Sequence, residues 1–107
     1  MIIESTKRVL LKGKQIRKTI FENEWWFVVA DVVSVLTNTV NPNDYINKMR
    51  RLDPELAKGY GQIVHILPID TEGGDQRMDC AKTEGIFRII QSIPSPLQFQ
   101  TEFGSKT

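Results

Sequence analysis

The segment Asn41–Leu52 holds the side chains whose types and spacing are best suited to a binding chemistry. Pro42 has the geometry preferred at the first position of a helix, and Asn41 is a good cap before it. At about 100° per residue, one side of this helix is apolar and consists of Tyr45, Ile46, Met49 and Leu52. The other side is polar and consists of Asn43, Asn47, Arg50 and Arg51, with Lys48 on the flank.

The polar side of this helix carries the two groups that read nucleic acids. Amides pair with adenine edges, and guanidinium groups pair with guanine edges or with phosphates. This layout is typical of a recognition helix. A solvated helix face that happens to be basic would give the same pattern, and from these residues alone it is the favoured interpretation.

The overall charge limits how such a helix could act. The chain has 107 residues, enough for one domain, and a net charge of +1. Any affinity for nucleic acid must therefore come from local clustering of the 14 Lys and Arg residues. Two clusters are present, one at Lys7, Arg8, Lys12, Lys14, Arg17 and Lys18, the other at Lys48, Arg50, Arg51 and Lys58.

Cysteine content and hydropathy indicate a cytoplasmic protein. Cys80 is the only cysteine, so the chain cannot form an internal disulfide. No apolar run approaches the roughly 20 residues that span a bilayer, so we expect no membrane association. The first five residues show no pattern of a signal peptide.

The elements around the helix predict an α+β domain. Residues 15–22 and 25–29 are predicted as strands of a hairpin that turns at Asn23-Glu24, after an arm, 1–13, in which 9–11 could pair as a short strand. Residues 62–69, apolar on both faces, predict a central strand that pairs with 76–81. Asp53 is expected to cap a short helical piece that ends near Gly59, and Thr83 is expected to cap a helix through about Ser92.

The segment 28–36 is ambiguous. Its β-branched residues favour a continued strand, whereas the spacing of Val29, Val32, Val33 and Leu36 fits a helix with Asp31 in its first turn.

No group of residues assembles an active site, so we expect no enzyme, no cofactor and no metal. Asp31 has no identifiable partner for acid–base chemistry and is better explained as a helix-capping residue. His65 lacks further metal ligands at suitable spacing, and Cys80 is best explained as a buried small hydrophobe. Of Trp25 and Trp26, at least one should be buried, because adjacent strand residues face opposite sides.

Several separated motifs resemble one known family in the right order. They are Ile16-Arg17-Lys18-Thr19, the run from Trp25 to Val33, Val35-Leu36-Thr37 and Asn41-Pro42. Together they closely resemble the BRO-family N-terminal domain of prophage antirepressors, and the run from Thr83 to Pro96 is similar to that family's closing helix. More narrowly, the chain resembles the branch that includes the DNA-damage-inducible protein D. The resemblance covers residues 14–96, whereas the tail, 97–107, departs from the family pattern.

The resemblance implies a domain that binds double-stranded DNA in phage and bacterial regulators of transcription. It also implies a helix that starts near Asp31, so that 31–37 and 42–52 form a helix–turn–helix-like pair packed with small antiparallel β-hairpins and a C-terminal helix. With the resemblance added, the recognition-helix interpretation becomes the favoured one. Asn43 and Asn47 would then contact base edges, Lys48, Arg50 and Arg51 would contact phosphates or guanine, and Lys12, Lys14 and Arg17 would add backbone contacts.

A rival hypothesis explains the same resemblance without DNA. An antirepressor can act by titrating its partner, so the chain could be a protein-interaction module that binds a repressor or a DNA-repair protein. A homodimer is a candidate assembly under either hypothesis. The two hypotheses differ in salt dependence and in the surface that matters.

One packing expectation concerns the second half of the domain. Phe87 and Ile90 follow helical spacing, and we expect them to pack against the strand at 62–69. If Phe87 is fully buried there, Phe87→Ala should cost about 3–5 kcal/mol.

Overall fold

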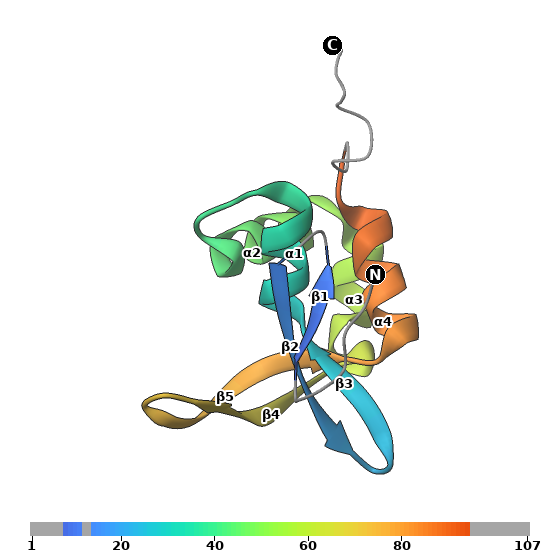
Figure 1. Ribbon diagram of the computed structural model, residues 1–107. Helices are drawn as coiled ribbons and strands as arrows, with labels where there is room; N and C mark the ends of the chain where they lie inside the picture. Colours follow the sequence, from blue (N-terminus) through green and yellow to red (C-terminus); the bar gives the residue numbers. More distant parts are fainter. Residues whose placement is uncertain (1–7, 12–13, 95–107) are drawn as a thin grey trace.

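A computed structural model describes residues 8–11 and 14–94, and it contains five strands and four helices (Figure 1). Their order along the chain is β1 (Arg8–Leu11), β2 (Lys14–Phe21), β3 (Glu24–Val28), α1 (Val29–Thr37), α2 (Pro42–Leu52), α3 (Pro54–Ile63), β4 (Val64–Thr71), β5 (Gly74–Ala81) and α4 (Thr83–Ser92). The predicted α+β class is therefore confirmed. Lys12 and the tail at 97–107 lie outside the described residues.

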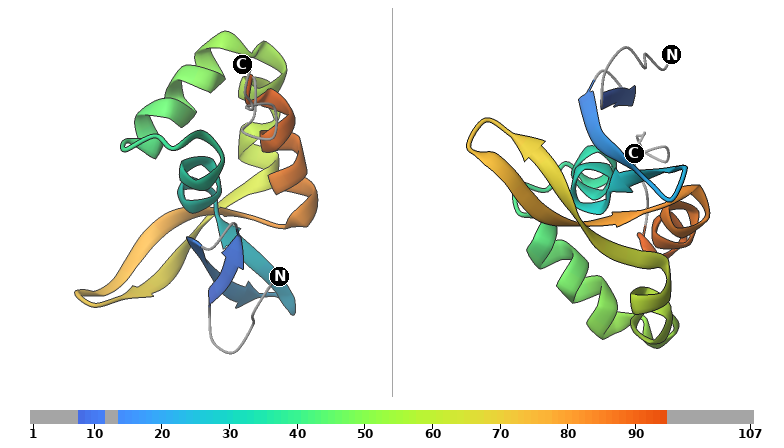
Figure 2. Two further views of the ribbon diagram at one scale, coloured as in Figure 1. Left: turned by 45° about the horizontal axis from the view of Figure 1, so that its top comes forward. Right: turned by 90° about the horizontal axis from the view of Figure 1, so that it is seen from below.

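The sheet is built from two antiparallel hairpins, β2-β3 and β4-β5, which meet over a short junction, and β1 is added beside β2. The strand order is β1-β2-β3-β5-β4. β3 and β5 pair only through Phe27 with Ala81 and Val28 with Cys80. From this junction the hairpins diverge, and the four helices gather on one side of it (Figure 1, Figure 2).

The first hairpin is confirmed, with its turn one residue earlier than predicted. Glu22 and Asn23 have φ values of 53° and 64°. Two consecutive positive φ values are typical of the turns whose twist matches the flanking strands. Trp26 is buried and Trp25 is exposed, as alternation along a strand requires. The predicted pairing of residues 9–11 is also confirmed, because Val9 pairs with Ile16.

The ambiguous segment 28–36 is helical from Val29 onward. α1 follows β3 without a loop, and Val29, Val32 and Val33 are buried. Asp31 lies in the first turn, as predicted. The implied helix is therefore confirmed, although it starts two residues before Asp31.

α3 is longer than predicted, because it continues through Gly59 and Gly61 to Ile63. The prediction that it ends near Gly59 was wrong. Each Gly costs a helix about 1 kcal/mol relative to Ala, but Leu56 and Tyr60 are almost completely buried and hold the helix on the core. Residues 62 and 63 therefore belong to the helix, and the following strand begins at Val64.

The prediction that this apolar strand is central was wrong, because β4 lies at the edge of the sheet. Leu67 and Ile69 are buried on one face, whereas Ile66 is 55% exposed on the other. Pro68 is compatible with an edge, since an edge strand has one side without pairing partners. An apolar run alone does not distinguish burial on one face from burial on both.

α4 ends at Ser92 as predicted, but it starts one residue earlier and has a different orientation. The residue before it, Lys82, is the N-cap and makes no side-chain capping hydrogen bond, so Thr83 is not the cap. Phe87 is 66% exposed, and Ile89 occupies the fully buried position instead. Ile90 packs against Ile16, Val32 and Val35 rather than against β4. The expected contact of Phe87 with the strand was therefore wrong.

Asp53 lies between α2 and α3 and also contacts the end of α4. Its Oδ1 accepts hydrogen bonds from the backbone N–H groups of Glu55 and Leu56, each at 3.1 Å. Its Oδ2 accepts one from the Ser92 hydroxyl at 2.6 Å. These bonds, chiefly the one from Ser92, and the nearby Arg88 guanidinium hold the pKa of Asp53 below its usual value. The predicted cap is thus confirmed, and it also anchors the end of α4.

The orientation of α4 predicts opposite outcomes for two neighbouring truncations. Ile89→Ala removes a fully buried side chain and should destabilise the domain by about 2–5 kcal/mol. Phe87→Ala removes an exposed one and should change the stability by less than about 0.5 kcal/mol. Urea unfolding of both variants measures the difference. A large loss for Phe87→Ala would contradict the observed orientation.

The Asp53 cluster predicts a pH-dependent contribution to stability. Because the folded-state pKa of Asp53 is depressed, its contribution is present above the unfolded value of about 3.9 and is lost as the pH falls through the folded value. Asp53→Asn should therefore lower the free energy of unfolding more at pH 7 than at pH 3. Ser92→Ala removes the hydrogen bond that lowers this pKa most. This change should also reduce the dependence of the free energy of unfolding on pH. An Asn variant with an equal deficit at both pH values would argue against this role of the carboxylate.

Candidate nucleic-acid interface

α2 is held by one apolar face, largely as its sequence predicts. Ile46 and Met49 are buried in the main core, and Tyr45 is half-buried against it. The helix begins at Pro42, and the Asn41 side chain accepts a hydrogen bond from the Asp44 N–H at 3.3 Å. Leu52 is the exception on this side, since it is 73% exposed.

The polar face predicted for α2 is exposed to solvent. The exposed side chains are Asn43, Asn47, Lys48, Arg50 and Arg51. Among the described residues, Lys48 and Arg51 have no hydrogen-bond or ion-pair partner. Their charges are therefore available to a ligand. Their contact with DNA stays a prediction.

Arg50 is held differently from the other cations of this face. Its guanidinium carbon lies 4.2 Å from the centre of the Tyr60 ring, on α3. The Tyr60 hydroxyl donates a hydrogen bond to Asp79 Oδ2, on β5, at 2.8 Å. Burial and this hydrogen bond raise the pKa of Tyr60 above its usual value, so the hydroxyl remains a neutral donor. The result is a chain of contacts from α2 through α3 to the second hairpin.

Arg17 makes a bidentate ion pair with Asp31, which links β2 to α1. Its Nε and Nη2 donate to the two carboxylate oxygens, each at 2.8 Å, and its backbone N–H donates to Oδ2 at 2.9 Å. The side-chain hydrogen bonds to Asp31, and then the charge of that carboxylate, raise the pKa of Arg17. Asp31 thus has the partner that sequence inspection did not identify, and much of the donor capacity of Arg17 serves the fold.

Lys14, another predicted contact, lies on β2 beside the end of α1. Lys14 is exposed, and its Nζ donates to Asn38 Oδ1 at 3.3 Å. Lys14 is therefore placed beside the turn that connects α1 to α2, whereas Lys12 is outside the described residues.

A polar hollow of about 440 Å³ brings Arg17 and Asn43 together between α1, α2 and β5. Arg77, on β5, lines the same hollow and has no hydrogen-bond or ion-pair partner among the described residues. The sequence alone did not place Arg77 in the interface. In the sequence Arg77 stands out because no other Lys or Arg lies between Lys58 and Lys82. Only the packing of the second hairpin beside α2 places it in the interface.

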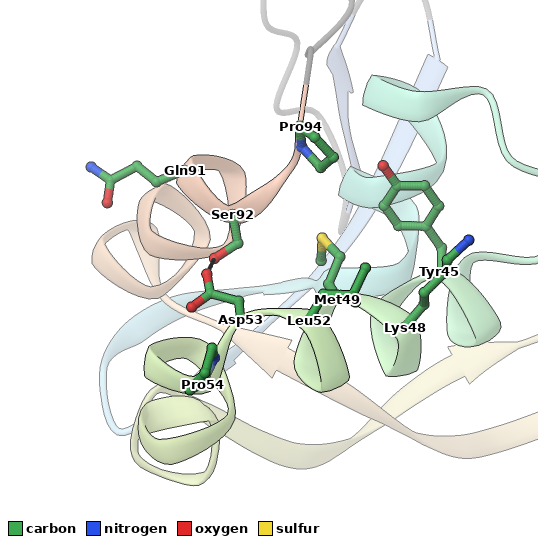
Figure 3. A pocket seen from close by; sticks show the side chains of 9 residues that line it. All are labelled: Tyr45, Lys48, Met49, Leu52, Asp53, Pro54, Gln91, Ser92 and Pro94. Atoms are coloured by element: carbon green, nitrogen blue, oxygen red, sulfur yellow. Dashed lines mark hydrogen bonds between the residues drawn. The ribbon is translucent and has the colours of Figure 1, made fainter.

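A second pocket, of about 580 Å³, lies between α2, the start of α3 and the end of α4 (Figure 3). Tyr45, Met49 and Leu52 line it from α2, and the Asp53–Ser92 hydrogen bond crosses between the helices. Its apolar lining suits the side chains of a protein better than a phosphate backbone.

The groups considered for other chemistry have structural surroundings. Cys80 is fully buried, as predicted, and burial is the main cause that raises its pKa to about 11. His65 lies on β4, with its ring centre 4.6 Å from that of Trp26. Within residues 8–11 and 14–94, no three His, Cys, Asp or Glu side chains are grouped as metal ligands would be. No helix in this part of the chain is long and apolar enough to cross a membrane.

Comparison with known proteins identifies the family of this fold. Searches of the curated proteins and of the solved structures gave no match. The sequence does match the BRO family, N-terminal domain, over residues 15–102. That range contains α2, the Arg17–Asp31 pair and the Arg50–Tyr60–Asp79 contacts. Because the match covers most of its length, the chain belongs to the BRO family as an N-terminal domain.

Proposed function

We propose that this domain binds double-stranded DNA through α2, as the DNA-binding part of a prophage-type antirepressor or transcriptional regulator. The observation that carries the proposal is the exposed polar face of α2. It combines amide and guanidinium groups, and Ile46 and Met49 fix its direction from the core. Membership of the BRO family supports this interpretation over a solvated basic face.

The arrangement of α1 and α2 suits insertion into a groove. α1 ends at Thr37, Asn38 adopts the left-handed conformation with φ of 60°, and α2 begins at Pro42. In helix–turn–helix proteins the second helix enters the major groove and reads bases mainly with its N-terminal residues. In this role Asn43 and Asn47 would pair with adenine edges, and Lys48 and Arg51 would contact phosphates.

Charge on the second hairpin gives the domain one direction of approach to DNA. Asp70, Glu72 and Asp75 are exposed at the end of that hairpin, and Asp70 pairs directly with Asp75. Phosphates repel this end. Arg77, on the same hairpin, lines the polar hollow next to α2. It would add a contact to the DNA backbone beside the helix. With a net charge of +1, the attraction is local, and binding should weaken markedly at physiological salt.

Two finer features belong to the same proposal. The first is a role in the DNA-damage response, which the resemblance to the DNA-damage-inducible branch suggests. The second is a location in the cytoplasm, at the nucleoid. The rival function is that a repressor or repair protein docks without DNA. The apolar pocket between α2 and α4 offers that rival a surface that shares only Lys48 with the proposed DNA interface.

The main test is the double change Arg50→Ala and Arg51→Ala. Loss of both guanidinium groups should weaken duplex binding, and the log–log salt slope should become shallower by about 2 if both contact phosphates and by about 1 if only Arg51 does. Because Arg50 stacks on Tyr60, about 0.5–1 kcal/mol of stability should also be lost, which lowers Tm by at most about 8 °C. Fluorescence anisotropy with labelled duplex and thermal unfolding on the same samples measure both effects.

Lys82→Ala is the matched control, because it removes a half-buried cation that lies at the start of α4 and pairs with Glu24, on β3, at 3.2 Å. The salt slope should then stay unchanged. If the wild type shows no salt-dependent binding, the rival function replaces the proposal. If the double variant binds like the wild type, the interface lies elsewhere, and Lys12, Lys14 and Arg17 are the next candidates.

A further inference from the structure

We propose that Arg50 is the guanine-reading residue of α2 and that Tyr60 is the positioning residue that aims it. This inference rests on the proposed binding of DNA and adds a division of roles within the interface. Arg50 would supply sequence specificity, whereas Arg51 and Lys48 would supply affinity that does not depend on sequence.

Arg50 lies over an aromatic ring, and its hydrogen-bond donors have no partner among the described residues. A guanidinium that stacks on an aromatic ring uses its face, so the N–H groups in its plane remain available. Arg50 is exposed, and its guanidinium carbon is 4.2 Å from the Tyr60 ring centre. Two parallel N–H groups of an arginine match O6 and N7 of guanine, the commonest specific contact in the major groove.

Tyr60 is itself held rigidly, which makes it a suitable platform. It is only 4% exposed, and its hydroxyl is fixed to Asp79 at 2.8 Å. Tyr60 therefore contacts α2 through its ring and β5 through its hydroxyl. A side chain that is ordered before binding loses less conformational entropy when it forms its hydrogen bonds.

Arg51 provides the contrast within the same turn of helix. It is exposed, and it has no hydrogen-bond or ion-pair partner among residues 8–11 and 14–94. A long, unrestrained cation suits phosphates, which are present at every step of the duplex and carry no sequence information. Lys48 shares this environment on the flank of the helix.

The experiment is selection of bound duplexes from a randomised pool by the wild type, Arg50→Lys and Arg51→Lys. Both variants keep their charge and replace the planar fork with an ammonium group. The wild type should select a motif with at least one required guanine. Arg50→Lys should lose the preference at one guanine by roughly 5- to 150-fold, and Arg51→Lys should select the wild-type motif.

A second measurement tests the role of Tyr60 without a substitution that could unfold the core. Nitrogen relaxation of the arginine Nε–H groups in the free protein should show Arg50 ordered and Arg51 mobile. Equal mobility of the two would overturn the positioning role of Tyr60.

The remaining outcomes separate this inference from the proposed function. If Arg50→Lys selects the wild-type motif, or if the wild type binds duplexes without any preference, the reading role of Arg50 is overturned while DNA binding stands. If the wild type binds no duplex at all, the proposed function fails and this inference fails with it.

Discussion

The pairing of β3 with β5 is the contact on which the remaining structure depends. It consists of two residue pairs, Phe27 with Ala81 and Val28 with Cys80, and the last three of these residues are completely buried. α1 starts immediately after Val28, and α4 starts two residues after Ala81. Both helices therefore take their position from the junction. α2, which carries the proposed DNA surface, packs in turn on α1 and α3.

Close approach at Gly85 explains how α4 fits beside this junction. A Cβ atom at Gly85 would lie 3.0 Å from the Ala81 Cβ and 3.0 Å from the Ile63 carbonyl oxygen. No other side chain would allow the same distance without movement of the backbone. This contact points the Gly85 side of α4 toward the sheet, together with Ile89 one turn later, and it turns Phe87 outward. The missing side chain thus sets the rotation of the whole helix.

Local signals in the sequence were sufficient for some elements and insufficient for others. The α2 helix and the first hairpin follow from caps, turn residues and hydrophobic spacing, all of which act within a few positions. The length of α3, the edge position of β4 and the rotation of α4 depend on partners far along the chain. The same division holds in the candidate site. Exposure of the α2 cations was predictable from the helix alone, but the stacking of Arg50 on Tyr60 and the approach of Arg77 required the packing of three elements.

The short junction also has a consequence for how the domain folds. Each hairpin pairs residues that are close in sequence, so it closes a small loop and can form early. Phe27 and Ala81, by contrast, are 54 positions apart, and the entropy of bringing them together must be lost before α1 and α4 can pack on one sheet. We therefore expect the hairpins to form first and the helical layer to form last. Substitutions in α2 or α4 should then act mainly on the rate of unfolding, and substitutions at the junction mainly on the rate of folding.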